Sequence, residues 1–123
     1  MTALLETAAR ACDRYGFAGV RCSTRPDAVD SERLDLLKAY RVTAVELGAQ
    51  SMDDGVLQLN RRGHTARDVE NAAALLRAYG FELGLQMMTG LPGDTDEKAV
   101  ETARALLRLR PDTMRIYPTI VLE

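Results

Sequence analysis

The sequence of 123 residues has no tryptophan, 5% aromatic residues and only two cysteines. So few aromatic side chains argue against a base-stacking platform and against the aromatic belt of a membrane protein. Cys12 and Cys22 are too few for a disulfide scaffold or for a metal site of their own. No apolar run approaches the roughly 20 residues of a membrane span, and charges interrupt residues 1–15, where a signal peptide would be apolar. We therefore expect a cytoplasmic protein without a membrane partner.

An excess of charge of one sign is also missing. Sixteen basic residues face eighteen acidic ones, which gives a net charge of -2. A nucleic-acid groove usually shows a basic excess, so the composition gives no support for nucleic-acid binding by this segment. The 46% of hydrophobic residues is enough for a core, and the length predicts one domain over residues 1–123.

A repeated phrase, typical of a helix end with a cation in the last turn followed by Gly or Pro, organises the chain. It occurs at residues 11–17, 36–42, 75–81 and, degraded, 106–112. A short apolar or β-branched run follows each copy, at residues 19–23, 44–47, 83–88 and 114–121. Runs of this length between turn signals predict strands, and their near-continuous apolarity favours a parallel sheet.

Start signals precede the helices between these strands. Asp30 or Ser31 is expected to cap one helix, Thr65-x-x-Asp68 to open a second and Asp94-x-x-Glu97 to open a third. A shorter helix is expected over residues 53–60.

The alternation of strands and helices predicts an α/β fold, namely a partial (βα) barrel of roughly four parallel strands with covering helices. Four strands cannot close a barrel, which typically takes about eight. The chain also begins on a helix and stops at Glu123 near a strand, so we expect a segment of a larger barrel with open sheet edges that favour self-association. A small doubly wound domain is the alternative.

Ligands of parallel βα folds collect where strands run into helices. The loops expected there, residues 23–27, 48–51, 89–95 and 117–119, are rich in polar residues, Gly and Pro. The glycines of residues 89–95 would let the backbone approach a ligand, although a tight strand-to-helix turn is the more common explanation for them.

Two groups of charged or polar residues stand out, and each allows more than one interpretation. Glu46 and Gln50 could grip ribose hydroxyls, or Glu46 could pair with Arg21 or Arg115. Residues 61–64, which include Arg62 and His64, are typical of a solvated charged corner. A barrel enzyme using Glu46 and His64 as acid and base is a rival interpretation, and it requires both side chains in one cleft.

Several phrases in register carry a family resemblance. They are Ser23–Asp27, Val45–Ser51, Arg62–Thr65, Gly84–Thr95 and Arg115–Thr119. Together they resemble the radical S-adenosylmethionine superfamily, in the branch of the elongator catalytic subunit and oxygen-independent coproporphyrinogen oxidase. The resemblance implies strands three to six of a TIM-like (βα)6 barrel whose parent protein binds S-adenosylmethionine and a [4Fe-4S] cluster and forms a 5′-deoxyadenosyl radical, for example to modify tRNA or another small substrate.

The resemblance also implies roles for single residues. Gln50 falls at a ribose-hydroxyl contact, and Arg62 falls where an arginine pairs with the methionine carboxylate. Met88 and Pro118 fall where two strands flank the adenine. The remaining candidates line neighbouring strand ends: Ser23, Arg25 and Gln86.

The family's CxxxCxxC cluster loop has no counterpart here, because Cys12 and Cys22 do not match its spacing. The resemblance therefore predicts part of an S-adenosylmethionine-binding wall that needs the remaining N-terminal barrel strands and is inactive alone. The alternative is a non-catalytic barrel remnant that acts as a scaffold or binding segment.

Overall fold

A computed structural model describes residues 2–122. Strands and helices alternate along the chain in the predicted order, with a helix pair between the second and third strands. The helices are α1 Thr2–Tyr15, α2 Ser31–Ala39, α3 Asp54–Leu59, α4 Ala66–Ala78 and α5 Asp96–Arg108, with a 3-10 turn at Pro26–Ala28. The strands are β1 Val20–Thr24, β2 Val42–Gln50, β3 Glu82–Thr89 and β4 Thr113–Pro118.

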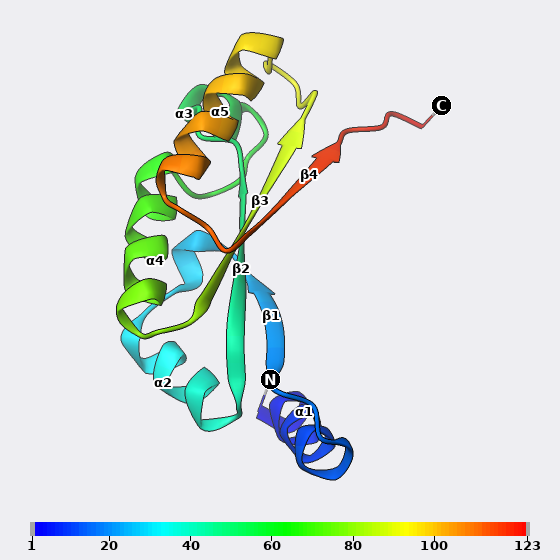
Figure 1. Cartoon of the computed structure of the whole chain (residues 1–123). Coiled ribbons are helices and arrows are strands. Elements are labelled where there is room, and N and C mark those ends of the chain that lie inside the picture. Colours follow the sequence, from blue (N-terminus) through cyan, green and yellow to red (C-terminus); the bar gives the residue numbers. More distant parts are fainter. Residues whose placement is uncertain (1, 123) are drawn as a thin grey trace.

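The four strands form one parallel sheet in the order β1-β2-β3-β4. Helices α2, α4 and α5 lie on one face of this sheet, whereas α1 lies beside the lower end of β1 (Figure 1). Among residues 2–122, no helix covers the opposite face of β2, β3 and β4. Parallel strands that are neighbours in sequence and in space, with their crossover helices on one side, are the arrangement of a barrel wall. The predicted α/β fold, a partial (βα) barrel, is confirmed.

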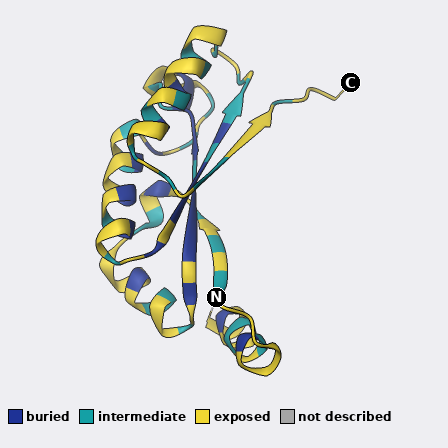
Figure 2. Ribbon diagram, viewed as in Figure 1, coloured by how far each residue is buried: buried dark blue, intermediate teal, exposed yellow. Residues whose placement is uncertain are grey.

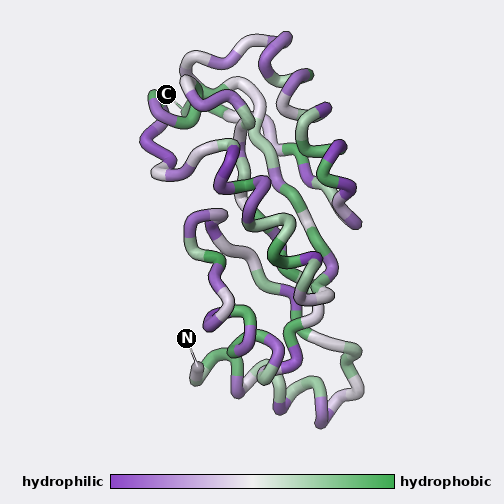
Figure 3. Tube along the Cα trace, turned by 90° about the vertical axis from the view of Figure 1, so that its left-hand side faces the viewer, coloured by the Kyte–Doolittle hydropathy of each residue, from purple (hydrophilic) through white to green (hydrophobic). Residues whose placement is uncertain are grey.

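The core lies between the central strands and the helix layer. Val45, Leu47, Leu83 and Leu85 are 0% exposed and belong to one apolar cluster with side chains of α4 and α5. Figure 2 shows burial concentrated on β2, β3 and the inner sides of the helices. Figure 3 shows the helix layer from outside, where hydrophilic and hydrophobic residues alternate along the helices. This amphipathic pattern is what fixes which face of the sheet is covered.

The helix starts follow local hydrogen bonding. The Asp30 carboxylate accepts from the Arg33 amide and caps α2, and Thr65 with Asp68 forms a full capping box on α4. The prediction that Asp94 opens the last helix is wrong by one residue, because Thr95 caps α5. The Asp94 carboxylate instead accepts from the backbone amides of Gly90 and Thr95, which closes the preceding turn.

Two strand lengths also differ from expectation. β2 extends to Gln50 rather than ending at residue 47, and β4 ends at Pro118 rather than at residue 121. The Thr119 amide donates to the Thr89 carbonyl, and the chain then leaves the sheet. Among the helices of residues 2–122, none has the length and apolar character that crossing a membrane requires.

Candidate functional site

The carboxyl ends of the four strands meet at one edge of the sheet, and their loops are tied together there. The Arg25 guanidinium donates to the Arg62 carbonyl at 3.2 Å. The Asn60 side-chain amide donates to the Pro92 carbonyl at 2.9 Å, which links the loop after α3 to the loop after β3. These two bonds tie residues 23–27 and 89–95, two of the loops that the sequence predicted to bear the ligand, to the loop between α3 and α4. We call this edge of the sheet, with its loops, the rim.

Gln50 lies at the end of β2 in an unusual conformation. Its φ is 65°, and the Ser51 amide donates to the Ala49 carbonyl at 2.8 Å, so Gln50 is the centre of a three-residue turn. A positive φ at the centre of such a turn is rare and strained for a residue with a side chain. Gln50 is 6% exposed, and its Oε1 has no hydrogen-bond partner within residues 2–122. The strand end therefore holds an unused acceptor in a buried position.

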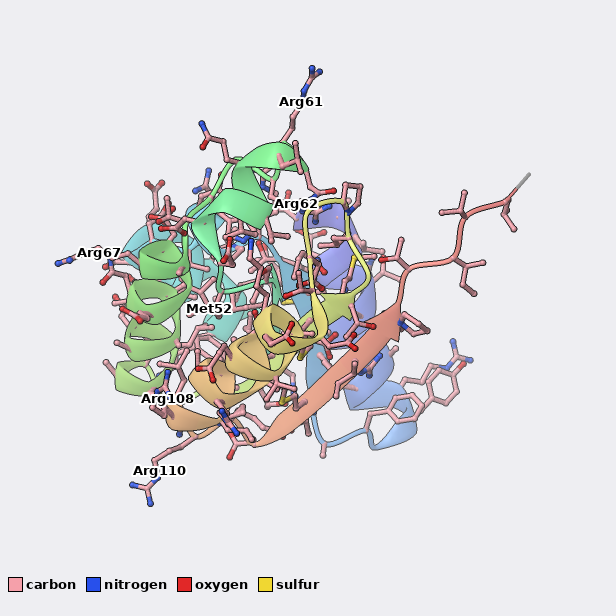
Figure 4. The ribbon with its side chains drawn as sticks, turned by 90° about the horizontal axis from the view of Figure 1, so that it is seen from above. Met52, Arg61, Arg62, Arg67, Arg108 and Arg110 are labelled. Atoms are coloured by element: carbon pink, nitrogen blue, oxygen red, sulfur yellow. The ribbon has the colours of Figure 1, made fainter. Side chains whose placement is uncertain are left out.

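Arg62 lies in the loop between α3 and α4. Its Nε is buried and has no hydrogen-bond partner among the described residues. Figure 4 looks down on the molecule from above and shows Arg61 projecting away from it, whereas Arg62 does not. The interpretation of residues 61–64 as a solvated corner holds for exposed Arg61 and is wrong for His64, which is 6% exposed. The polar ring of His64 can be buried because its Nε2 forms a hydrogen bond with the Ala49 carbonyl of β2.

Arg25 is already engaged within the chain. Its Nε and Nη2 donate to the two carboxylate oxygens of Asp27 at 2.9 and 2.8 Å. This bidentate contact with Arg25 holds the pKa of Asp27 below its ordinary value. Arg25 thus lies at the rim, as predicted, and its guanidinium supports the loop that carries Arg62.

The uncovered face of the sheet holds the other candidates. In the strand register Ser23 lies beside Glu46, Gln86 beside Arg115, and Met88 beside Tyr117. Ser23 is exposed, whereas Gln86 and Met88 are half-buried. The last candidate, exposed Pro118, ends β4 beside Thr89. These residues and Gln50 approach the rim from four adjacent strands.

Glu46 has a structural partner. Its carboxylate is 3.1 Å from the Arg115 Nε and its side chain is 3% exposed, while Arg21 pairs with Glu82 instead. A Cβ on Gly84 would lie 3.2 Å from the Glu46 Cγ, so the glycine leaves room for this side chain. The structure thus decides between the two partners that the sequence left open.

The rival enzyme based on Glu46 and His64 is not supported. The surface pocket that His64 lines, of about 510 Å³, is shared with residues of α3 and α4 such as Asp54 and Asp68, and Glu46 is not among its lining residues. Glu46 instead faces Arg115 on the uncovered face. The acid and the base are not brought into one cleft.

The cysteines do not form a cluster site. Cys12 is buried on α1, and Cys22 is half-buried on β1 among residues that pack on the helix side. Burial raises the pKa of the Cys22 thiol, which disfavours the thiolate that binds iron. Within residues 2–122, no three His, Cys, Asp or Glu side chains gather as a metal site requires.

Comparison with known proteins decides the family. The model of the radical SAM superfamily matches residues 2–106. The chain belongs to this superfamily. The structure of the archaeal Elp3 of Methanocaldococcus infernus with an N-terminal deletion superimposes with a TM-score of 0.81 at 30% identity, over 86% of this chain and 26% of its own. Coproporphyrinogen III oxidase of Escherichia coli, with a TM-score of 0.80 at 21% identity over 99% of this chain and 29% of its own, shares the fold.

The curated relatives point to one branch. A tRNA uridine(34) acetyltransferase of Dehalococcoides mccartyi is 37% identical over 96% of this chain and 25% of its own length. Elongator complex protein 3 of Saccharomyces cerevisiae is 33% identical over 85% of this chain and 19% of its own length. The chain therefore spans about a quarter or less of the length of these two relatives, and the predicted resemblance to the elongator branch is confirmed.

Sequence reasoning missed how three rim residues are used. The burial of His64, the turn at Gln50 and the engagement of Arg25 by Asp27 all depend on contacts between separate loops. The spacing Arg25-x-Asp27 was the one local signal available, because residues two apart in a tight turn can pair. Nothing in the local sequence around His64 indicates that its partner is Ala49, 15 residues earlier.

Proposed function

We propose that this chain supplies part of the S-adenosylmethionine-binding wall of a radical SAM enzyme that modifies tRNA. The observation that carries the proposal is that two of the four buried side-chain atoms without a partner in residues 2–122 are the Gln50 Oε1 acceptor and the Arg62 Nε donor, both at the rim; the other two are His64 Nδ1 and Thr119 Oγ1. A buried polar atom without a partner is costly, so two of them at the carboxyl edge of a parallel sheet support a ligand that satisfies both. The names of the curated relatives support tRNA as the substrate of the longer enzyme.

The chemistry of the two atoms fits S-adenosylmethionine. An amide oxygen accepts a hydrogen bond from a ribose hydroxyl, and a guanidinium donates through Nε and one terminal nitrogen to a carboxylate. We assign Gln50 to the ribose and Arg62 to the methionine carboxylate. Met88 and Pro118 offer apolar surface for the adenine, and Ser23, Arg25 and Gln86 complete the wall.

Bound S-adenosylmethionine would supply the radical chemistry for which the superfamily is named. The part of this chain is to bind and orient it. Gln50 would fix the sugar and Arg62 would fix the amino acid end, which together set the position of the sulfonium between them. Gln50 ends β2 and Arg62 lies in the α3–α4 loop, and hydrogen bonds from other residues hold both positions, so little ordering is left to occur on binding.

The two cysteines do not fit a [4Fe-4S] cluster. They lie on a helix and on the covered side of a strand, away from the rim. The two cysteines therefore supply no cluster ligands, and we expect the chain on its own not to convert S-adenosylmethionine to 5′-deoxyadenosine. We also propose a cytoplasmic location, and further protein against the open edges at β1 and β4, supplied by the remaining barrel strands or by a second copy.

Titration of the isotopically labelled chain with S-adenosylmethionine, followed by NMR, tests the proposal. Arg62→Ala should weaken binding by about tenfold or more, because hydrogen bonds to charged groups contribute roughly 1.5–3 kcal/mol. Gln50→Ala should weaken it by about fivefold, as expected for a neutral hydrogen bond. Arg61→Ala is the matched control, since it removes the same charge from an exposed neighbouring side chain.

A second candidate function is a scaffold whose motif residues serve the fold alone. The contacts of Arg25 with Asp27 and with the Arg62 carbonyl favour it, because they show one motif residue used internally. This alternative predicts no binding of S-adenosylmethionine, or equal effects of Arg61→Ala and Arg62→Ala. Either result would overturn the proposed function.

A further inference from the structure

His64 is a buried side chain for which the proposed binding wall gives no role. Its Nε2 lies 3.0 Å from the Ala49 carbonyl oxygen. A carbonyl can only accept, so Nε2 carries the proton and donates, and the ring is held as the neutral Nε2–H tautomer or the imidazolium. The ring is 6% exposed, and Nδ1 has no partner within residues 2–122. A hydrogen bond shielded from water in this way is worth more than one at the surface.

The acceptor of this bond is one end of the strained turn at Gln50. The Ala49 carbonyl accepts hydrogen bonds from the Ser51 amide and from the His64 ring, and Ala49 itself is 0% exposed. The pairing of β2 with β3 shifts register between Gly48 and Gln50, so the strand ladder does not fix this turn. A residue with a side chain keeps a positive φ only where several surrounding contacts hold it in that conformation. His64 supplies one such contact.

The donor of this bond belongs to the loop that carries Arg62. This loop turns sharply, with φ of 50° at Arg61 and 78° at Gly63. A Cβ at position 63 would lie 2.7 Å from the Arg25 Nη2, so the loop fits closely against its neighbour. Arg25 itself is exposed, and water competes for its contact with the Arg62 carbonyl. The buried tie between this loop and β2 is therefore the bond from His64.

We infer that His64 is a positioning residue that fixes Gln50 and Arg62 relative to each other. It joins the carbonyl next to Gln50 to a loop position two residues beyond Arg62, through one buried hydrogen bond. The inference rests on the proposed function for its ligand, S-adenosylmethionine. Its structural part concerns this chain alone and can be tested without that ligand.

The structural part is tested by trypsin, which cuts after arginine. His64→Leu keeps an apolar body of similar size and removes the donor, whereas His64→Gln places an amide donor near the position of Nε2. We expect His64→Leu to speed cleavage after Arg61 and Arg62 by about fivefold to tenfold, the effect of losing one hydrogen bond on local opening. His64→Gln should restore the wild-type rate, and cleavage after Arg14, on distant α1, should not change in either variant.

Urea unfolding of the same variants separates this local effect from general destabilisation. If His64→Leu leaves cleavage after Arg61 and Arg62 at the wild-type rate, the inference is wrong. Equal acceleration at Arg14 would also overturn it, because the residue would then support the whole fold. Failure of His64→Gln to slow cleavage would show that packing of the ring, and not its hydrogen bond, holds the loop.

The functional part is tested by a double-mutant cycle on S-adenosylmethionine binding. His64→Leu should weaken binding about fivefold in the wild-type background and much less in an Arg62→Ala background, since there is then no guanidinium left to position. Equal effects in both backgrounds would overturn the positioning role. A wild-type chain that binds no S-adenosylmethionine would overturn the proposed function, and the trypsin result would then decide the inference by itself.

Discussion

The two faces of the central strands follow different rules. On the covered face of β2 and β3, side chains such as Leu47 and Leu85 are apolar and 0% exposed. On the uncovered face the same strands carry Glu46 and Gln86, which are polar and lie in register with Ser23 on β1 and Arg115 on β4. Because successive side chains of a strand point to opposite faces, the residues that pack in the core alternate with the polar residues that could contact a ligand.

The faces differ in what a neighbouring residue must supply. An apolar side chain on the covered face needs only volume to pack against, which α4 and α5 provide. A polar side chain on the uncovered face or at the rim needs one partner at a defined place, as Glu46 has in Arg115. Gln50 lacks such a partner at Oε1. The contrast explains why substitutions on the two faces should affect different measurements.

The largest effect is expected from substituting adjacent residues on opposite faces of β3. Leu85→Ala should lower the free energy of unfolding by about 2–5 kcal/mol, because it leaves a cavity in a close-packed core. Gln86→Ala, its neighbour on the uncovered face, should cost less than about 1 kcal/mol. Urea unfolding monitored by circular dichroism measures both. Similar losses for the two variants would mean that half-buried Gln86 is packed as tightly as Leu85, which is 0% exposed.

The covered face was predictable because its signals are local. Apolar runs, helix stops and the caps at Asp30 and Thr65 lie within a few residues of each other, and the structure has them where the sequence indicated. For the rim, the sequence predicted its position in the fold but not which of its residues form contacts. Which of its residues are engaged depends on contacts across 37 residues for Arg25 and Arg62, and 15 for His64 and Ala49.

The backbone of the rim was also beyond sequence reasoning. Residues with a positive φ are usually glycines, yet Gln50 and Arg61 adopt it with full side chains. No local residue preference indicates that state, because the surrounding loops impose it. Even at Asp94 and Thr95, two good capping residues in succession, sequence preference placed the helix start one residue early.

A middle-sized effect should come from the strained turn. Gln50→Gly should give a more stable protein than Gln50→Ala by about 1 kcal/mol, since glycine adopts a positive φ without the steric cost of a Cβ. Both variants lose the amide and should bind S-adenosylmethionine equally weakly. Thermal unfolding and the NMR titration together separate the two effects. If Gln50→Ala is as stable as Gln50→Gly, the turn is not strained. His64 would then not be needed to hold Gln50 at its positive φ.

The smallest effect is expected on the pH dependence of stability. The side chains that pack on the covered face are apolar, whereas the rim carries carboxylates, so acid should act on the rim. The Val56 amide, assisted by the Lys98 ammonium, holds the pKa of Asp53 below its ordinary value. A carboxyl group with a lowered pKa in the folded state stabilises the fold above its unfolded pKa, and the stability is lost as the pH falls through the folded value. We therefore expect a loss confined to the range below about pH 4.

Asp53→Asn isolates this contribution. Asparagine caps a helix about as well as aspartate, so the variant should keep its stability near neutral pH to within about 1 kcal/mol. It should lose less stability than the wild type as the pH falls below about 4, measured in steps of about one pH unit. Amide exchange along α3 would localise the change, and Asp35→Asn, on exposed α2 surface, is the control. If both variants and the wild type lose the same stability in acid, the groups that titrate lie away from the rim. The difference between the two faces would then not include the charged groups.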